Sequence, residues 1–147
     1  MSASEGYLIS TDRTRLDIDA IHAFLNRESY WARGVERERV ERSIAGSLCF
    51  GAYRDDVQVG FARVVTDRAT FAWLADVFVV AAERGRGVGK LLVEAVVDHP
   101  DVRPVRRILL ATADAHGLYE RYGFRPLERT ERFMAVEPAV PGRLPPR

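Results

Sequence analysis

The sequence has one cysteine, Cys49, among its 147 residues, and it has no long apolar run. A single cysteine excludes an internal disulfide and a cysteine-rich zinc site, so no metal is expected. The most apolar stretch, residues 71–82, carries Asp76 in its middle and is too short to span a membrane. The first six residues lack a basic region followed by an apolar stretch, so no signal peptide is expected. These absences favour a cytoplasmic protein.

The sequence also lacks an excess of positive or negative charge. The 22 lysines and arginines and the 21 acidic residues give a formal net charge of +1, too balanced for a nucleic-acid binder. The chain has the length of one ordinary domain, and its 47% hydrophobic content is enough for a packed core. We therefore expect one domain over residues 1–137 and a disordered, proline-rich tail over 138–147, with no nucleic-acid or membrane partner.

The first half of the chain predicts a short strand, two helices and a three-stranded meander. Apolar residues at helical spacing indicate the helices, and β-rich runs separated by turn residues indicate the strands. The loop between the two helices, residues 28–34, has no clear period. The expected elements are strand 7–10, helices 16–26 and 35–44, and strands 48–54, 58–66 and 70–80.

The pattern changes after residue 80. Apolar residues at positions i, i+3, i+4, i+7 and i+8 from Val88 predict an amphipathic helix, which His99-Pro100 ends. An apolar strand over 107–112 follows, and a strand–helix–strand crossover makes it parallel to strand 70–80. The remaining expected elements are a short helix over 116–122 closed by Gly123, and strands over 124–127 and 132–136.

The most informative segment joins strand 70–80 to the helix that begins at Val88. It reads Arg84-Gly85-Arg86-Gly87-Val88-Gly89-Lys90. Glycines permit backbone conformations and close approaches that a Cβ forbids. The first amides of a helix have no intrahelical acceptor, and with the helix dipole they form an anion site suited to phosphate or pyrophosphate. The two arginines and the lysine add positive charge there.

Two common nucleotide loops do not fit this segment. A dinucleotide loop, G-x-G-x-x-G, could start at Gly85, but its third glycine position holds Lys90. A Walker loop needs glycine at position 84 and Ser or Thr after the lysine, and these positions hold Arg84 and Leu91. An unoccupied tight turn with surface arginines is the remaining simple interpretation.

Arg84-x-x-Gly87-x-Gly89 after an apolar strand resembles the acetyl-CoA pyrophosphate loop of the GNAT superfamily of N-acetyltransferases. A second segment, His116-Gly-Leu-Tyr-Glu-Arg-Tyr-Gly-Phe124, resembles the superfamily's segment after its fifth strand. The order of elements also fits, from Tyr7 to about Glu137. The chain is similar to small bacterial members whose substrate is unassigned.

The resemblance implies an α/β fold with a mixed, six- to seven-stranded central sheet and about four flanking helices. Strands 70–80 and 107–112, the fourth and fifth, would splay apart. It also implies direct transfer of acetyl from acetyl-CoA, the co-substrate, to a primary amine. The site residues it implies are Phe78, Val79 and Val80 for backbone contacts to the pantetheine arm, residues 84–90 for the pyrophosphate, and Tyr119 as the acid that protonates the departing thiolate.

Other candidate residues have less certain roles. Asp76 is placed by strand alternation on one face with Leu74 and Phe78, and a carboxylate there is costly unless it has a partner or a task. It is either a base or substrate anchor, or a structural hydrogen-bond acceptor. Cys49, in an apolar strand, is expected in the core rather than as a nucleophile. Tyr122 is the alternative to Tyr119 as the acid.

The acceptor side is less well defined by the sequence. In this fold the loop between the first two helices forms one wall of the acceptor pocket, which makes Tyr30, Trp31 and Arg33 candidate substrate residues. Trp31 could instead anchor the loop to the core. His116, one turn before Tyr119, is a further candidate. A small-molecule amine is the favoured acceptor; a protein lysine or N-terminus, an inactive CoA-binding module and a nucleotide-binding module are alternatives, and a homodimer is left open.

Overall fold

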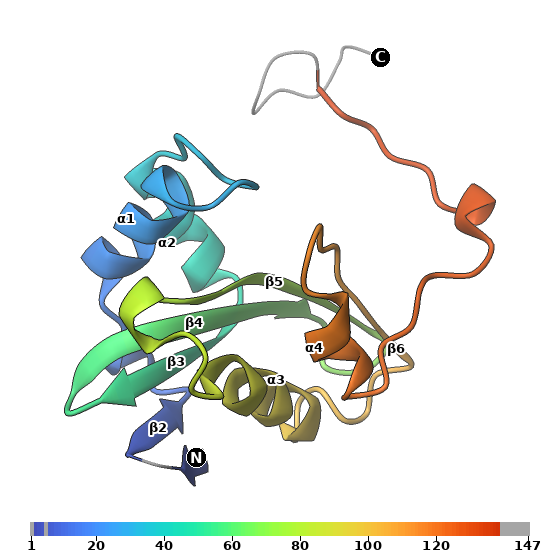
Figure 1. Ribbon diagram of the computed structural model, residues 1–147. Coiled ribbons are helices and arrows are strands. Elements are labelled where there is room, and N and C mark those ends of the chain that lie inside the picture. The colour runs from blue at the N-terminus through green and yellow to red at the C-terminus, as the bar shows by residue number, and fades with distance from the viewer. Residues whose placement is uncertain (1, 5, 139–147) are drawn as a thin grey trace.

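The structure is a computed structural model that describes residues 2–4 and 6–138 (Figure 1). Six strands form one sheet in the order β1-β2-β3-β4-β5-β6. The first five pair antiparallel with their neighbours, whereas β6 pairs parallel with β5. The strands are β1 (Ser2–Ser4), β2 (Tyr7–Ser10), β3 (Leu48–Arg54), β4 (Val57–Thr66), β5 (Phe71–Val79) and β6 (Arg107–Leu109).

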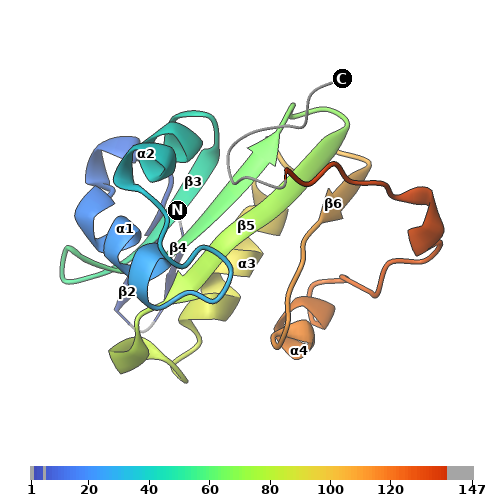
Figure 2. The same cartoon turned by 90° about the horizontal axis from the view of Figure 1, so that it is seen from above.

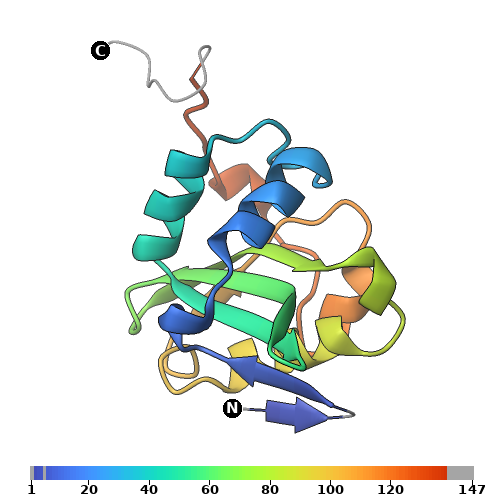
Figure 3. The same ribbon diagram turned by 90° about the vertical axis from the view of Figure 1, so that its left-hand side faces the viewer.

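Helices cover both faces of the sheet (Figures 1 and 3). The helices α1 (Ile18–Arg27) and α2 (Arg37–Ala45) lie on one face, and α3 (Val88–Asp98) lies on the other. The short helix α4 (His116–Glu120) stands beside α3 and β6. No helix among the described residues is long and apolar enough to cross a membrane. Three short 3-10 turns complete the fold: η1 (Arg13–Arg15), η2 (Ala81–Glu83) and η3 (Thr130–Arg132).

Local sequence explains several of these boundaries. The side chain of Asp17 accepts a hydrogen bond from the Ala20 amide and caps α1. Asp55 and Asp56, both with positive φ, form the two-residue turn of the β3–β4 hairpin, a conformation that matches the twist of the paired strands. Gly123, with φ of 91°, ends the α4 segment as expected from the sequence.

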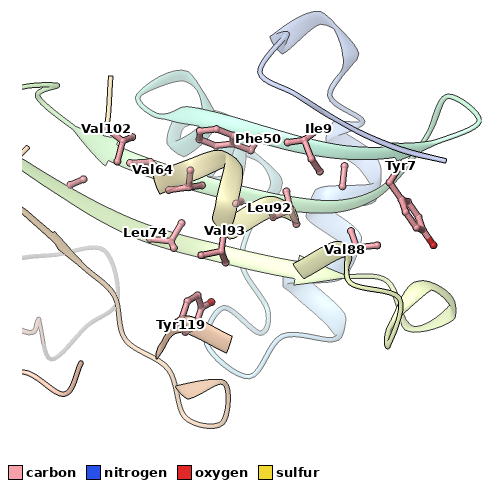
Figure 4. Close-up of a cluster of buried hydrophobic side chains, with 14 of the residues drawn as sticks. Tyr7, Ile9, Phe50, Val64, Leu74, Val88, Leu92, Val93, Val102 and Tyr119 are labelled. Atoms are coloured by element: carbon pink, nitrogen blue, oxygen red, sulfur yellow. The ribbon is translucent and has the colours of Figure 1, made fainter. Parts of the chain in front are cut away.

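The core consists of two clusters, one on each face of the sheet. On the α3 face, Leu92, Val93 and Val96 are fully buried and pack with Phe50 and Val64 (Figure 4). On the other face, buried residues of α1 and α2 pack with β4 and β5. Phe24 of α1 stacks on Phe78 of β5 with ring centroids 4.0 Å apart. The clusters fix both helical layers to the sheet.

The pairing of β5 with β6 is short. It runs from Phe71, opposite Arg107, to Trp73, opposite Leu109, and then stops. Beyond this point the chain after β6 leaves β5, and the two diverge (Figure 2). The mixed fold with splayed fourth and fifth predicted strands is therefore confirmed, although β6 is three residues shorter than the strand predicted over 107–112.

A β-bulge in β5 lies where the strands diverge. Arg63 of β4 pairs with Ala75 and Phe61 pairs with Phe78, so β5 carries one extra residue here. Asp76, with φ of 54°, is a non-glycine residue in the left-handed region. A bulge bends its strand and increases the local twist, which turns the second half of β5 away from β6.

The bulge corrects one prediction from strand alternation. Leu74 packs in the α3-side cluster, but Phe78 packs on the opposite face against α1. The expectation that Asp76 shares one face with both residues was therefore wrong. Side chains along a strand alternate between the two faces of the sheet. The extra residue shifts this alternation by one position, so side chains after the bulge face the opposite helical layer from the one that regular alternation predicts.

The two predicted C-terminal strands, 124–127 and 132–136, are also wrong. Pro126 has no N–H to donate to a strand ladder. Arg129 adopts a left-handed conformation and is followed by η3, which redirects the chain. The predicted tail over 138–147 lies outside the described residues except for Pro138. Conversely, β1 had not been predicted from the sequence and adds the sixth strand at the other edge.

Burial makes Cys49 chemically inert. It is 2% exposed, and burial raises the pKa of its thiol to about 11. The thiolate is the reactive form of cysteine. We therefore expect iodoacetamide at pH 8 to leave the native protein unmodified and to alkylate the protein in urea, as measured by mass spectrometry. Rapid labelling of the native protein would contradict the assignment of Cys49 to the core.

Candidate active site

A cavity of about 440 Å³ occupies the space where β5 and the chain after β6 separate. Its floor is formed by residues 73–77 of β5, and its opposite wall by residues 110–115. Tyr30 and Trp31 from the α1–α2 loop close one side, and Tyr119 of α4 lines the other. The volume is within the range of about 300–1,000 Å³ that is usual for small-molecule sites.

The α1–α2 loop bridges the two walls of this cavity. Trp31 donates its indole N–H to Asp76 Oδ1 (2.9 Å), on the β5 side. The hydroxyl of Tyr30 accepts from the Ala113 amide (2.9 Å), on the β6 side. The two rings meet edge to face with centroids 5.0 Å apart. These two contacts hold the loop across the opening of the cavity. Both aromatic rings remain partly exposed to solvent.

Asp76 is part of a partly buried polar network. Its Oδ2 accepts from Arg63 Nε (2.8 Å), and the Arg63 Nη1 also donates to Ser47 Oγ (3.0 Å). The side chains of Arg63 and Asp76 are only 17% and 12% exposed. Both oxygens of Asp76 therefore have a partner, one from β4 and one from the α1–α2 loop. A carboxylate has room for further acceptor contacts, so Asp76 can still bind a ligand N–H.

The end of β5 presents backbone groups on the side of the strand that faces away from β4. The Val80 amide donates to the Val59 carbonyl of β4 (2.9 Å). Because hydrogen-bonded residues alternate along an antiparallel ladder, Val79, opposite Gly60, directs its N–H and C=O away from β4. Phe78 and Val80 direct theirs toward β4. Of the three residues predicted to contact a cofactor through the backbone, Val79 is the one whose polar groups face the unpaired edge.

The glycine-rich segment follows directly. Gly85 and Gly87 have φ of 79° and 86°, and an added Cβ at either would meet no atom within 4 Å. Gly87 is the N-cap of α3 and supplies no side chain to cap the first amides. Space above the loop, a left-handed backbone and uncapped helix amides together make a cradle for an anionic ligand. Val88 is buried and seats this end of α3 on the sheet.

The charged residues of this segment have distinct places. Arg84 donates from Nε to the Val79 carbonyl (3.0 Å), which ties the loop to the open edge of β5. Arg86 lies 3.7 Å from the Glu83 carboxylate, and Lys90 is exposed in the first turn of α3. Gly89 lies closer to neighbouring side chains, with Leu118 3.6 Å from where a Cβ would stand. The predicted loop residues are therefore brought together at the start of α3.

The buried carboxylate of Glu83 holds the start of the glycine-rich loop in place. Glu83 accepts from the Tyr7 hydroxyl (3.2 Å) and from Arg54 Nη1 (3.0 Å). The bound Arg54 guanidinium holds the pKa of Glu83 below its usual value, so the carboxylate stays ionised and attracts Arg86. Glu83 thus anchors the turn η2 to β2 and β3 two residues before Gly85.

Tyr119 and Tyr122 have different surroundings. Tyr119 is 8% exposed, lines the cavity and packs beside the α3-side cluster (Figure 4). Burial raises the pKa of Tyr119 to about 12, so its hydroxyl keeps its proton at neutral and moderately alkaline pH. Tyr122 instead donates its hydroxyl to the Lys90 carbonyl (3.1 Å) and ties α4 to α3. The cavity wall therefore contains Tyr119 and not Tyr122.

Two predicted substrate residues lie elsewhere. Arg33 is exposed and is not part of the cavity lining. His116 is also exposed and lines a second groove beside β6, which shares Trp73, Tyr119 and residues 110–112 with the cavity. Tyr30, Trp31, Asp76 and Tyr119 are thus the side chains that the structure brings together.

Sequence reasoning missed Arg63 and Glu83. A signal for Arg63 was present, because it is a lone charge in an apolar strand, as Asp76 is in the next. The β4–β5 hairpin places the two residues nearly opposite each other. Glu83 had no comparable signal, since a charged residue before a loop is ordinary, and its partners Tyr7 and Arg54 are distant in sequence.

The fold and the site together define a class of protein. A mixed sheet that opens between two parallel strands, with an anion cradle at the end of one strand and a buried tyrosine opposite, suits a long phosphate-containing ligand that lies between the strands.

Comparisons with known proteins agree with this class. The acetyltransferase (GNAT) domain matches residues 45–126. A candidate acetyltransferase of Gibberella zeae is 30% identical, and the match covers 77% of this chain and 75% of that protein. A crystal structure of a candidate GNAT-family acetyltransferase from Xanthomonas campestris pv. campestris is 50% identical, with a TM-score of 0.86 over 92% of this chain and 94% of its own.

A more distant likeness is one of fold alone. The structure of a candidate acetyltransferase from Clostridium acetobutylicum, solved with acetyl-CoA, is 14% identical, with a TM-score of 0.64 over 89% of this chain and 94% of its own. The domain match takes in more than half of the present sequence, and the Gibberella relative aligns with more than two thirds of it. The chain belongs to the GNAT acetyltransferase family.

The Arg63–Asp76 ion pair generates a stability prediction. Replacing Arg63 with Met keeps the apolar stem but leaves the Asp76 carboxylate without its ionic partner, and breaking a buried pair typically costs about 3 kcal/mol. Arg68→Met is the control, because the Arg68–Asp101 pair is exposed and such pairs contribute less than about 1 kcal/mol. Urea unfolding measures both. Equal losses for the two variants would show that the pair does not hold the bulge.

Proposed function

We propose that this protein is an acetyl-CoA-dependent N-acetyltransferase that transfers acetyl directly to the primary amine of a small molecule, with both substrates bound at once. The observation that supports this most strongly is the position of the cavity. It is lined by residues 73–77 of β5, which lead to the open backbone edge at Val79, and by Tyr119 of α4 on the opposite side. A thioester laid along β5 would meet an acceptor held under Tyr30 and Trp31.

The described residues fit acetyl-CoA as a co-substrate. The pantetheine arm contains amides, which can pair with Val79 as an added strand would. The pyrophosphate can lie on the first amides of α3, where the space above Gly85 and Gly87 is open and Arg86 and Lys90 supply positive charge. The acetyl-CoA bound by the Clostridium structure supports the same assignment through the shared fold.

The lining of the cavity favours a cationic amine as the acceptor. Asp76 and Asp114 are its two carboxylates, and no Lys, Arg or His side chain lines it among the described residues. Tyr30, Trp31 and Trp73 supply aromatic faces, which attract ammonium groups. A cavity of about 440 Å³ suits a small molecule better than a protein surface. A search for the acceptor should therefore screen a library of small amines first and peptides second.

We assign the chemical roles as follows. Asp76 and the aromatic loop hold the acceptor as its ammonium form, which gives one proton to the Asp76 carboxylate and then attacks the thioester carbonyl with the freed lone pair. The Val79 N–H stabilises the negative charge that develops on the carbonyl oxygen. A C–N bond forms, the C–S bond breaks, and Tyr119 donates its proton to the departing thiolate. The nitrogen then loses its second proton, which restores the Tyr119 hydroxyl. Holding both reactants in one cleft supplies much of the rate.

The glycine loop provides a test of cofactor binding. Gly87→Val places a side chain in the space proposed for the pyrophosphate, so affinity for acetyl-CoA measured by calorimetry is expected to fall at least about tenfold. Gly6→Val is the matched control: Gly6 also has φ of 86° and open space around its Cβ position, but it lies in the β1–β2 turn. Equal affinity in both folded variants would remove the loop from the cofactor site.

The hydroxyl of Tyr119 provides a test of catalysis. Tyr119→Phe keeps the ring and its packing but removes the proton donor. Acetyl-CoA binding is expected to survive, while kcat for an amine found in an acetylation screen falls by about ten- to a thousand-fold. Release of the CoA thiol measures turnover, and calorimetry measures binding.

Tyr122→Phe is the control for this prediction, because its hydroxyl binds the Lys90 carbonyl outside the cavity. It is expected to lower stability by about 1 kcal/mol and to leave kcat nearly unchanged. If Tyr122→Phe is the impaired enzyme and Tyr119→Phe turns over normally, the acid has been assigned to the wrong tyrosine. A protein that binds acetyl-CoA but acetylates no amine or peptide would be a binding module instead.

A further inference from the structure

The two carboxylates that line the cavity differ in how their charge is balanced. Asp76 forms an ion pair with Arg63 and accepts a second hydrogen bond from Trp31. Asp114 is exposed, and among the residues that the structure describes its carboxylate takes part in no ion pair and accepts no hydrogen bond. The cavity therefore carries one negative charge, at Asp114, that has no protein counter-ion.

Backbone contacts fix the position of Asp114 at the cavity wall. The hydroxyl of Thr112 accepts from the amides of Asp114 (3.4 Å) and Ala115 (3.1 Å). The hydroxyl of Tyr30 accepts from the amide of Ala113 (2.9 Å). Three consecutive amides before α4 thus have side-chain acceptors, and one of these acceptors comes from the α1–α2 loop. These bonds hold the backbone of Asp114 at the same opening that the aromatic loop crosses.

The hydroxyl of Tyr119 is a second polar group in this wall without a partner. Tyr119 is 8% exposed and lines the cavity, and none of the described residues hydrogen-bonds to its hydroxyl. Buried polar groups normally have a partner, so this hydroxyl points to a ligand in the cavity. Burial raises the pKa of Tyr119, and the nearby charges of Tyr30 and Asp114 add to the rise. Asp114 and Tyr119 are therefore close enough to act on the same bound molecule.

The two carboxylates belong to different walls of the cavity. Asp76 lies in β5, whereas Asp114 lies in the segment between β6 and α4. The rest of the lining is largely aromatic and aliphatic, with Trp73, Leu74 and Leu110 among its residues. A molecule that reaches from one wall to the other meets a carboxylate at each end and apolar groups along its length. Such a cavity complements two cationic groups joined by a short apolar chain.

We infer that the acceptor carries two cationic groups and that Asp114 selects for the one that is not acetylated. This inference rests on the proposed function, in which the reacting ammonium lies at Asp76 under the aromatic loop. The second cationic group then lies at Asp114 and supplies the missing counter-ion. A monoamine fills one position only and leaves the Asp114 charge unmatched. Because the carboxylate lies in a concave site, its attraction for a cation is stronger than on an open surface.

Calorimetry with paired amines tests the role of Asp114. The probes are α,ω-diamines of increasing length, each compared with the monoamine of the same length, in buffer that contains CoA so that no transfer occurs. The best diamine is expected to bind at least about fivefold more tightly than its monoamine, as one added ion pair allows, and added salt is expected to reduce this preference. Asp114→Asn should abolish the preference and leave monoamine affinity unchanged.

Two further variants separate charge selection from a structural effect. Asp114→Lys should reverse the preference, so that the monoamine binds more tightly than the diamine, which a loss of structure alone would not do. Asp55→Asn is the matched control, because it removes the same charge from the exposed β3–β4 turn, where Asn also suits the positive φ. It is expected to keep the preference of the unmodified protein. Thermal unfolding verifies that all three variants are folded.

The outcomes distinguish this inference from the proposed function. Equal affinity for diamine and monoamine, no binding of any diamine, or a preference that survives Asp114→Asn would overturn the role of Asp114. Release of the CoA thiol from acetyl-CoA tests transfer with the same amines. Acetylation of monoamines and diamines alike, with or without Asp114, would support the transfer and overturn this inference. A diamine that binds through Asp114 but is not acetylated would support the inference and contradict the proposed transfer.

Discussion

The ion pair between Arg63 and Asp76 joins β4 to β5 at the one place where β5 departs from regular strand geometry. Asp76 holds a left-handed backbone conformation that costs a non-glycine residue about 1 kcal/mol or more. The strand keeps this conformation because the carboxylate receives the Arg63 guanidinium on one oxygen and the Trp31 indole on the other. The bulge turns β5 away from β6, and the cavity, the open edge at Val79 and the place of the aromatic loop all follow from that turn.

The same residue therefore links the framework to the site. An Asp76 that only bound substrate would be free to change with the substrate, and one that only held the bulge would have no reason to line the cavity. Asp76 lines the cavity and also receives two structural hydrogen bonds, so the proposed substrate contact and the bulge depend on one carboxylate. A substitution there alters the shape of β5 as well as the chemistry of the pocket, so its kinetic effects cannot be assigned to one role without the stability measured alongside.

Most of the regular structure could be predicted from the sequence, because period and turn residues are local signals. The β3–β4 hairpin, α3 and its glycine loop are examples. The resemblance to acetyltransferases also singled out Tyr119 and Trp31, and both line the cavity. The prediction failed where distant parts of the chain decide the outcome. The bulge at Asp76 is held by Arg63 of the neighbouring strand, and the run 132–136 has the composition of a strand but pairs with no strand among the described residues. A strand forms only when its backbone pairs with a second segment, and the sequence pattern of one segment does not identify its partner.

The open edge at Val79 has a consequence for how this protein can change over time. Main-chain groups and positive-φ glycines make the proposed cofactor half of the cleft, so most side-chain substitutions nearby leave it intact. Side chains of a surface loop, Tyr30 and Trp31, make much of the other half. Under the proposed function, mutations in that loop alter which acceptor enters while the cofactor half stays intact. Because backbone groups form the proposed cofactor half and side chains form the proposed acceptor half, single substitutions can change acceptor preference without loss of cofactor binding.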